Sequence, residues 1–268
     1  MLDPSRGGRL ASWSIDAQEL LVGPPDGTDT SIHWGCFVMA PWPGRLAGGR
    51  FPWRGRTIQL ERTHGPHAIH GLTWNRPWTV EAASAEAATL AIELPREEWP
   101  MGGRVRQRVA VTPSELRLEA EIEADEPMPA ALGWHPWFLR RGDPRLRVDA
   151  ASYQLTRRLV PTGESAPVSR RTDLRDGPAL GRRRLDLCYL AAVPPAVVTW
   201  PELELTIAFE PSPAPLVVYT PRDSFCVEPL TAPPNALALP AEPRRRAGIR
   251  ELRSGELLRA SLTMSVRP

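Results

Sequence analysis

Two side chains in this sequence have the chemistry and the setting for proton transfer. His135 lies in Gly133-Trp134-His135-Pro136-Trp137-Phe138, where two indoles and a proline leave the imidazole little freedom and a partly dry setting. Glu228 closes the apolar run Phe225-Cys226-Val227 and precedes Pro229, and an acid so placed is seldom a free surface charge. An imidazole and a carboxylate form a common pair for general acid–base catalysis. A core histidine and a turn-capping carboxylate are the structural alternatives.

Further candidates lie outside these two motifs. The spacing His64-x-x-His67-x-x-His70 would stack three metal ligands on one face of a helix, but Gly65-Pro66 interrupts the run and opposes a helix. We therefore favour an organic binding site that uses His70 over a structural set, and either of these over a metal site. Asp186, between two leucines, is a second acid in an apolar run and a candidate for the same site.

Tryptophan supplies ten of the 18 aromatic residues (Trp 10, Phe 5, Tyr 3). Half of the tryptophans lie in or near the candidate motifs, namely Trp42, Trp74, Trp78, Trp134 and Trp137. A flat indole packs well against the C–H face of a sugar ring and keeps an N–H for a polar partner. Packing inside a large core would explain any one of them equally well. Together, beside histidines and acids, they favour a carbohydrate ligand.

The composition excludes several classes of protein. All 33 cationic side chains are arginine, because the 268 residues include no lysine. Schiff-base aldolases, pyridoxal-phosphate enzymes and P-loop nucleotide-binding proteins each require a lysine amine. The formal net charge of +2 leaves no electrostatic footprint for nucleic acid, so no nucleic-acid partner is expected.

The cysteines and the apolar runs indicate where the chain resides. Cys36, Cys188 and Cys226 form no CxxC pair, so neither a disulfide framework nor a zinc knuckle is expected. The first residues show no secretory signal, and Pro194 and Pro195 break the longest apolar stretch, Leu190 to Trp200. These features predict a cytoplasmic protein without membrane association.

The hydrophobic pattern predicts strands almost everywhere. Residues 115–124 alternate charged and apolar side chains at period two, as a half-buried antiparallel strand does, and a turn at Pro113-Ser114 joins them to a similar run from Val105 to Val111. Comparable runs are Trp13–Val22, Thr57–Glu61, Thr89–Leu94, Leu146–Ala150, Glu202–Phe209, Leu216–Thr220 and Leu257–Val266. Only the alanine-rich stretch 81–88 suggests a helix. We expect an all-β fold, one large antiparallel β-sandwich that forms a single domain over residues 1–268.

Two arginine-rich stretches, 170–178 and 240–248, and the triplets Arg182–Arg184 and Arg244–Arg246, are expected to be solvated loops. A pocket for a phosphate or sulfonate group is the alternative.

Several motifs together resemble a known family. In chain order they are Pro41-Trp42-Pro43-Gly44-Arg45-Leu46, Gly49-Arg50-Phe51, His67-Ala68-Ile69-His70-Gly71-Leu72, Gly133–Phe138, Asp186, and Val227-Glu228-Pro229 with Asn235. In this order they resemble aldose 1-epimerases (galactose mutarotase-like proteins) over about residues 10–265. The resemblance implies a galactose mutarotase-like supersandwich without a cofactor or metal, with a free sugar bound in an open cleft of one sheet.

The resemblance also implies roles for individual residues. His135 matches the general acid and Glu228 the general base, while His70, Arg45 and Asp186 match sugar-binding positions. Trp137 is a further candidate for sugar contact. The expected partner is a small-molecule sugar, and the chain is expected to be a monomer or homodimer.

Two departures from the family pattern concern the choice of sugar. Gly44 stands where an asparagine often precedes the arginine, and Val217 stands where galactose-directed members have a glutamine. The sequence thus predicts a mutarotase that opens the ring of an aldose, with the two catalytic groups on opposite sides of the C1–O5 bond. A nearby carboxylate is expected to raise the pKa of His135.

The alternatives are a non-catalytic carbohydrate-binding protein, a mutarotase for a phosphorylated or sulfonated hexose, and a glycosidase with Asp186 and Glu228 as its carboxylate pair.

Overall fold

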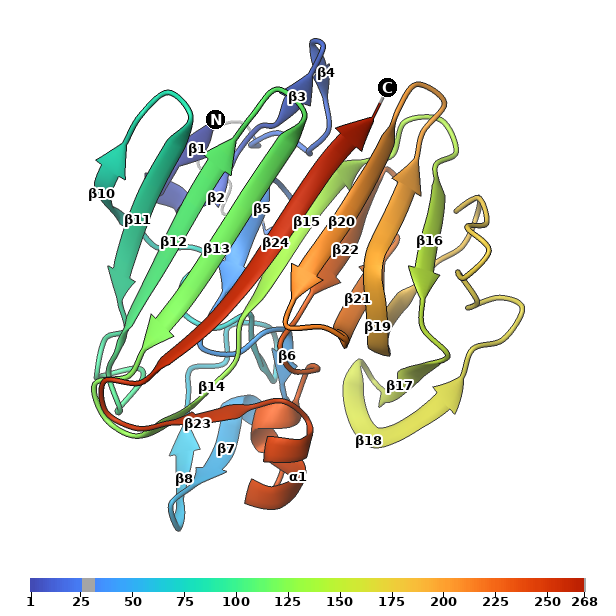
Figure 1. Ribbon diagram of the computed structural model, residues 1–268. Coiled ribbons are helices and arrows are strands. Elements are labelled where there is room, and N and C mark those ends of the chain that lie inside the picture. The colour runs from blue at the N-terminus through green and yellow to red at the C-terminus, as the bar shows by residue number, and fades with distance from the viewer. Residues whose placement is uncertain (26–31, 268) are drawn as a thin grey trace.

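Antiparallel strands make up almost all the regular structure of the computed structural model, which describes residues 1–25 and 32–267 (Figure 1). Sixteen of the strands in these ranges join into one sheet. The sheet changes layers at β19 (Asp186–Thr199), whose first half pairs with strands of one layer and whose second half pairs with strands of the other. Two packed layers result, so the prediction of a large antiparallel β-sandwich is confirmed.

The first layer contains the second half of β19 and seven further strands. These are β16 (Arg145–Asp149), β20 (Glu204–Glu210), β24 (Leu257–Arg267), β13 (Glu115–Glu123), β12 (Arg104–Val111), β11 (Ala87–Glu93) and β10 (Thr79–Ala83). Their alternating sequences put one face in the core and leave the other charged, as β13 illustrates: Leu118 and Ile122 are fully buried, whereas Glu123 is exposed.

The second layer contains the first half of β19 and eight further strands. These are β1 (Leu2–Asp3), β2 (Arg9–Leu10), β5 (Cys36–Met39), β15 (Gly133–Leu139), β22 (Ser224–Pro229), β21 (Ala214–Tyr219), β17 (Ser152–Arg157) and β18 (Val160–Pro167). Its central strands are buried on both faces. Trp134 and Phe138 of β15 join the core between the layers, whereas Trp137 belongs to a separate cluster on the opposite face.

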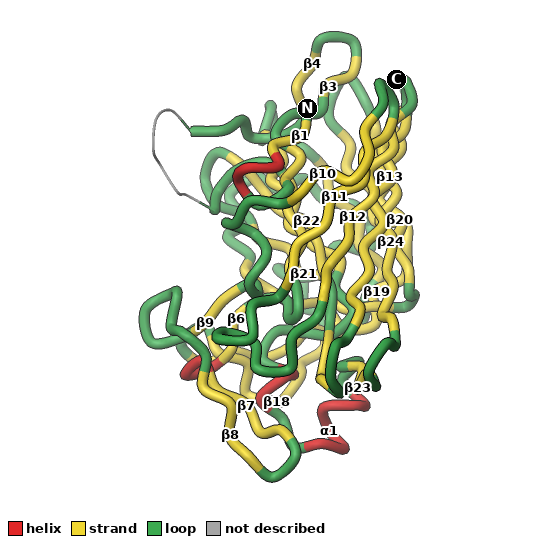
Figure 2. Tube along the Cα trace, turned by 90° about the vertical axis from the view of Figure 1, so that its left-hand side faces the viewer, coloured by secondary structure: helices red, strands yellow, loops and turns green. Residues whose placement is uncertain are grey.

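Short elements surround the sandwich (Figures 1 and 2). The paired short strands are β3 (Ser14–Ile15) with β4 (Gln18–Glu19), β6 (Arg45–Leu46) with β9 (Ala68–Ile69), β7 (Arg50–Trp53) with β8 (Arg56–Gln59), and β14 (Met128–Ala130) with β23 (Arg250–Leu252). The helical segments are α1 (Ala241–Arg246) and the 3-10 turns Pro4–Arg6, Ala47–Gly49 and Ala236–Ala238. Among the described residues, no helix is long and apolar enough to cross a membrane.

Three local expectations need correction. The run Trp13–Val22 is not one strand but the β3–β4 hairpin, because Asp16 and Ala17 take left-handed backbone conformations and turn the chain. The stretch 81–88 is not helical, since β10 and β11 pair across it. Residues 240–248 are not a solvated loop: they include α1, whose Arg244 is buried and ion-paired with Glu251.

Candidate functional site

A cavity of about 260 Å³ lies against the second layer, on the face turned away from the first layer. Strand alternation decides which side chains reach it, because residues two apart point to the same face. The cavity is lined from the strands by His135 and Trp137 of β15, Asp186 and Cys188 of β19, Val217 and Tyr219 of β21, Glu228 of β22 and Gln154 and Thr156 of β17. Loops, β6 and the β17–β18 hairpin complete its wall.

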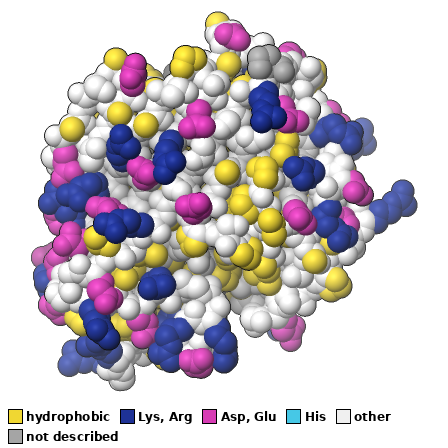
Figure 3. All heavy atoms as spheres, viewed as in Figure 1, with side chains coloured by type: hydrophobic (Ala, Val, Ile, Leu, Met, Phe, Trp, Pro, Cys, Tyr) yellow, Lys and Arg dark blue, Asp and Glu magenta, His cyan; other side chains and the backbone are white. Residues whose placement is uncertain are grey.

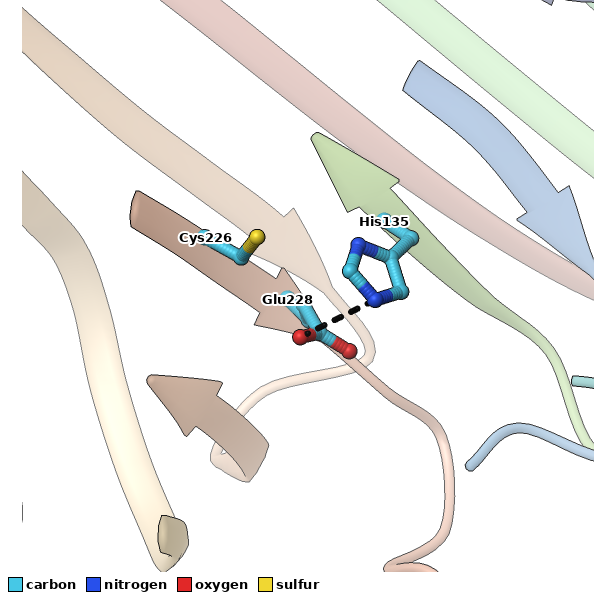
Figure 4. Close-up of side chains that lie close together, drawn as sticks. All are labelled: His135, Cys226 and Glu228. Carbon is cyan, nitrogen blue, oxygen red and sulfur yellow. Dashed lines mark ion pairs between the residues drawn. The ribbon is translucent and has the colours of Figure 1, made fainter. Parts of the chain in front are cut away.

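The strand register brings the two candidate proton-transfer groups together. Trp137 of β15 lies opposite Cys226 of β22, so His135 and Glu228, each two residues further, are neighbours across the same pair of strands. His135 Nε2 lies 3.4 Å from Glu228 Oε1, and both side chains are 5% exposed (Figure 4). The two groups lie side by side at the cavity floor. They are therefore in direct contact with each other and do not face each other across a bound sugar, as an arrangement on opposite sides of the C1–O5 bond led us to expect.

Aromatic rings fix the plane of the His135 imidazole. It stacks on Trp137 at a centroid distance of 5.1 Å and an angle of 9°, and on Phe37 at 4.9 Å and 28°. His70 meets it edge-on at 4.9 Å. The stacked rings hold the imidazole so that its Nε2 faces Glu228, which is the orientation that proton transfer requires.

Burial dominates the electrostatics of this pair. Desolvation, with Asp186 nearby, raises the pKa of the Glu228 carboxyl well above its ordinary value. Desolvation also lowers the pKa of His135 well below 6.5, and electrostatic repulsion of its protonated form by His70 and Arg9 lowers it further. The expectation that a carboxylate would raise the pKa of His135 is therefore wrong, because the imidazole is almost completely buried and its desolvation dominates.

His70 and Arg45 occupy one wall of the cavity. Pairing of β6 with β9 sets Arg45 opposite Ile69, and the His70 backbone N–H donates to the Gly44 carbonyl at 2.9 Å. Burial, together with Arg45, lowers the pKa of His70 to about 3, so its ring is neutral at physiological pH. Arg45 is half-buried and forms no ion pair among the described residues. It therefore offers free N–H donors to a ligand.

The acidic candidate lies at another side of the cavity. Asp186 is exposed at the start of β19, opposite Tyr219 of β21. Partial desolvation raises its pKa, and its charge contributes to a raised pKa of the Tyr219 phenol. Carboxylate and phenol together provide an acceptor and a donor beside the proton-transfer pair.

The tryptophans have another role than the sequence suggested. Trp137 borders the cavity but is 2% exposed, and one of its faces is covered by His135, so it positions that ring more than it offers a platform for sugar. Trp42, Trp74, Trp78 and Trp134 are buried and do not line the cavity. The interpretation of these four as sugar platforms is wrong, because both layers bury large side chains.

The three spaced histidines do not form a metal site in the described part of the chain. Gly65-Pro66 makes a turn, as expected, and His64 is exposed, His67 half-buried and His70 buried. One group of three possible ligands does occur in the described ranges: His135, Cys226 and Glu228 have ligand atoms within 4.8 Å of one another (Figure 4).

That group fits a resident metal ion poorly. Burial raises the pKa of the Cys226 thiol well above 9, so the thiolate that a metal requires is disfavoured. His135 Nδ1 has no hydrogen-bond partner, whereas metal-bound histidines almost always have one.

The two departures from the family pattern have different settings. Gly44 has φ +65°, and a Cβ atom there would lie 2.7 Å from Pro234 Cγ, so a side chain at this position is excluded by its neighbour. Val217 lies in the same cross-strand row as Glu228, directly opposite it, and lines the cavity. Its apolar side chain removes polar contacts from the carboxyl and contributes to the raised pKa.

Sequence reasoning missed several residues of the cavity. Tyr219 could have been found from the period-two alternation in the expected strand 216–220, since it shares a face with Val217. Gln154 and Leu159 lie in a segment without clear alternation, and only the fold of the β17–β18 hairpin brings them to the cavity.

A larger hollow, of about 620 Å³, lies on the outer face of the first layer. It is bordered by arginine and glutamate side chains that pair with one another, as Arg106 does with Glu121 and Arg108 with Glu119. Figure 3 shows both signs of charge interspersed over this side of the molecule. Paired surface charges and the absence of histidine or cysteine from its lining make it a poor catalytic site.

Comparison with known proteins agrees with this fold. A sequence model of the aldose 1-epimerase family matches residues 4–265. The uncharacterized protein YphB of Escherichia coli K12 is 26% identical over 247 residues, which cover 86% of this chain and 84% of that protein. A maltose epimerase of Levilactobacillus brevis is 25% identical over 194 residues, 61% of this chain and 54% of that enzyme.

Among solved structures, a galactose mutarotase-like protein from Clostridium acetobutylicum has the same fold. It superposes with a TM-score of 0.88 at 16% identity, covering 99% of this chain and 91% of that one.

Proposed function

This chain belongs to the aldose 1-epimerase family, and on that premise we propose that it interconverts the α and β anomers of a free aldose. One observation carries the proposal. An imidazole nitrogen and a carboxyl oxygen lie 3.4 Å apart at the floor of a cavity bordered by several hydrogen-bonding side chains. Mutarotation needs one group that takes a proton and one that gives a proton, and the pair provides both.

The spacing of the pair suits the reacting atoms of a sugar. The anomeric hydroxyl oxygen O1 and the ring oxygen O5 are both bonded to C1, so a base for one and an acid for the other must lie close together. Glu228 removes the proton from the O1 hydroxyl, and His135 donates a proton to O5 as the C1–O5 bond breaks. The aldehyde then rotates about C1–C2, and closure from its other face returns both protons.

The burial of the pair decides which partner holds a shared proton. The carboxyl binds a proton more strongly than in water and the imidazole binds one less strongly, so burial favours a shared proton on Glu228 over one on His135. Moving that proton to His135 creates the ionised arrangement without exchange with solvent. Sugar hydroxyls that hydrogen-bond to the carboxylate favour this arrangement in the complex. Positioned proton transfer of this kind contributes about 10²–10⁴-fold to a rate.

The remaining side chains hold the sugar. Arg45 donates to ring hydroxyls, and neutral His70 can donate or accept beside it. Asp186 accepts from a hydroxyl on another side of the ring. Together they restrict the sugar to positions in which C1 faces the catalytic pair, and such positioning contributes as much as the proton transfers do.

Polarimetry of a freshly dissolved α-aldose tests the proposal. The protein should accelerate the change of rotation over buffer for at least one hexose or pentose. Glu228→Gln and His135→Asn should each lower kcat by 10²-fold or more, while sugar binding stays measurable. Glu93→Gln and His67→Asn, which make the same chemical changes outside the cavity, should retain full activity.

Other outcomes of these measurements would point to another function or to another residue as the base. Binding of a sugar without acceleration would leave a carbohydrate-binding protein of the same fold. Acceleration restricted to a phosphorylated or sulfonated hexose would assign Arg45 to the anionic group. Retained activity in Glu228→Gln would remove that carboxyl from the role of base.

A further inference from the structure

We propose that the β17–β18 hairpin recognises the end of the aldose furthest from C1, with Gln154 as the residue that hydrogen-bonds to it. The proposal rests on the proposed function, because that function fixes C1 at the catalytic pair. The hairpin supplies Gln154, Thr156, Leu159 and Pro161 to the cavity wall.

The sheet register places Gln154 in line with the catalytic pair. The pairing of β17 with β19 sets Gln154 at the level of Cys188 on β19. Across the next two strand pairs, Cys188 lies opposite Val217 of β21, and Val217 lies opposite Glu228 of β22. Side chains in one such row point to the same face of the sheet. Three strand spacings separate Gln154 from Glu228, about 14 Å between their backbones. A pyranose with C1 at Glu228 therefore directs its opposite edge toward Gln154.

The Gln154 amide is available for a ligand. Among the described residues, its Nε2 donates only one long hydrogen bond, 3.5 Å to the Pro234 carbonyl, and its buried Oε1 has no partner. A buried carbonyl oxygen that stays unpaired is costly, which favours turning the amide toward a ligand that pairs with it. A sugar hydroxyl both donates and accepts, and two adjacent hydroxyls match both atoms of an amide.

The tip of the hairpin carries a second, independent sign of function. Arg158 and Leu159 form its two-residue turn with φ values of 51° and 64°, a conformation in which asparagine and glycine are strongly preferred. Leu159 is 54% exposed and also lines the cavity. A backbone conformation unfavourable to leucine, combined with an exposed apolar side chain, is explained if Leu159 contacts the ligand.

The central experiment measures kcat and KM for the preferred aldose and for its 2-, 3-, 4- and 6-deoxy forms. In Gln154→Leu, which keeps the size of the side chain, KM should rise about tenfold with kcat within twofold, as the loss of one hydrogen bond implies. The control is Gln18→Leu on β4, which also removes a buried Oε1 without a partner but lies outside the cavity. It should leave both constants unchanged.

The deoxy sugars distinguish contact from a merely structural role. Wild type should bind one of the 3-, 4- or 6-deoxy sugars about tenfold more weakly than the parent, and Gln154→Leu should bind that sugar and the parent alike. The 2-deoxy sugar should instead be weakened by Gln154→Leu to the same extent as the parent sugar, because the 2-hydroxyl does not contact Gln154. An unchanged KM, a loss confined to kcat, or equal losses with every sugar would overturn the assignment.

A second variant tests the hairpin tip without disturbing the fold. Arg158→Asn with Leu159→Gly creates the preferred turn sequence, so Tm should be unchanged or higher while KM rises. An unchanged KM would contradict a role for Leu159. If wild type accelerates no aldose, the proposed function fails, and sugar binding followed by tryptophan fluorescence still decides whether Gln154→Leu weakens the complex.

Discussion

His70 should make the fold sensitive to mild acid, and the size of the effect follows from its burial. Its pKa is about 3 in the folded chain, against 6.5 for the free side chain. Between these values the unfolded chain binds a proton that the folded chain does not, so stability must fall as the pH falls through this window. The full difference between the two pKa values corresponds to roughly 5 kcal/mol of folding stability, and about 2 kcal/mol of this stability is lost between pH 7 and pH 5.

The variant His70→Asn removes this dependence, because asparagine does not titrate. Urea unfolding at pH 7 and pH 5, followed by tryptophan fluorescence, gives the free energy of unfolding of each protein. Other groups, His135 among them, also reduce the stability of both proteins in acid. The difference in free energy of unfolding between wild type and His70→Asn isolates the contribution of His70. Between pH 7 and pH 5 this difference should shift by about 2 kcal/mol in favour of the variant.

The control is His67→Asn, because His67 is only half-buried and its pKa is lowered less than that of His70, so its substitution should shift the difference less. Equal pH dependence in wild type and His70→Asn would contradict a lowered pKa of His70 in the folded chain. It would mean that the buried ring either keeps its proton in the folded chain or is hydrated there.

Three further predictions concern the site and its frame. The rate of mutarotation should stay level from neutral pH to well below 6.5 and fall only below the lowered pKa of His135; on the alkaline side it should fall above the raised pKa of Glu228. A profile that halves near pH 6.5 would contradict the burial of the pair. Gly44→Ala should destabilise the fold by about 2 kcal/mol or more by urea unfolding, because Pro234 blocks its Cβ. Gly55→Ala, with a similar φ but nothing within 4 Å, should lose only about 1 kcal/mol, and equal losses would exclude the clash. Dialysis against a chelator should leave the rate of mutarotation unchanged, since proton transfer needs only the two side chains. A loss of rate that zinc restores would show that the reaction requires a metal ion.

Much of the sandwich could be predicted from the sequence, because one face of the first layer is exposed to solvent and its strands therefore alternate charged and apolar residues. The alternation in residues 115–124 identifies β13 directly, since its outward side chains are charged. The central strands of the second layer are buried on both faces, which removes the alternation. The run Gly133–Leu139 therefore gave no strand signal, although it supplies His135.

The candidate residues could be identified, but their environment could not. Sequence motifs pointed to His135 and Glu228, and the register of β15 and β22 brings them together. The direction of their pKa shifts depends on how completely water is excluded, and that depends in part on Phe37 of β5 and Val217 of β21, which lie far from both motifs in the sequence. Gln154 reaches the cavity only through the fold of its hairpin, and no local pattern in the sequence indicates it.

The most direct measurement of the central claim is the polarimetric rate with wild type and with Glu228→Gln, on the same fresh α-aldose and at equal sugar occupancy. With Glu228 as the base, wild type should strongly accelerate the change of rotation, and the variant should lose 10²-fold or more of that rate with the sugar still bound. Equal rates for the two proteins at full occupancy would contradict this role of Glu228.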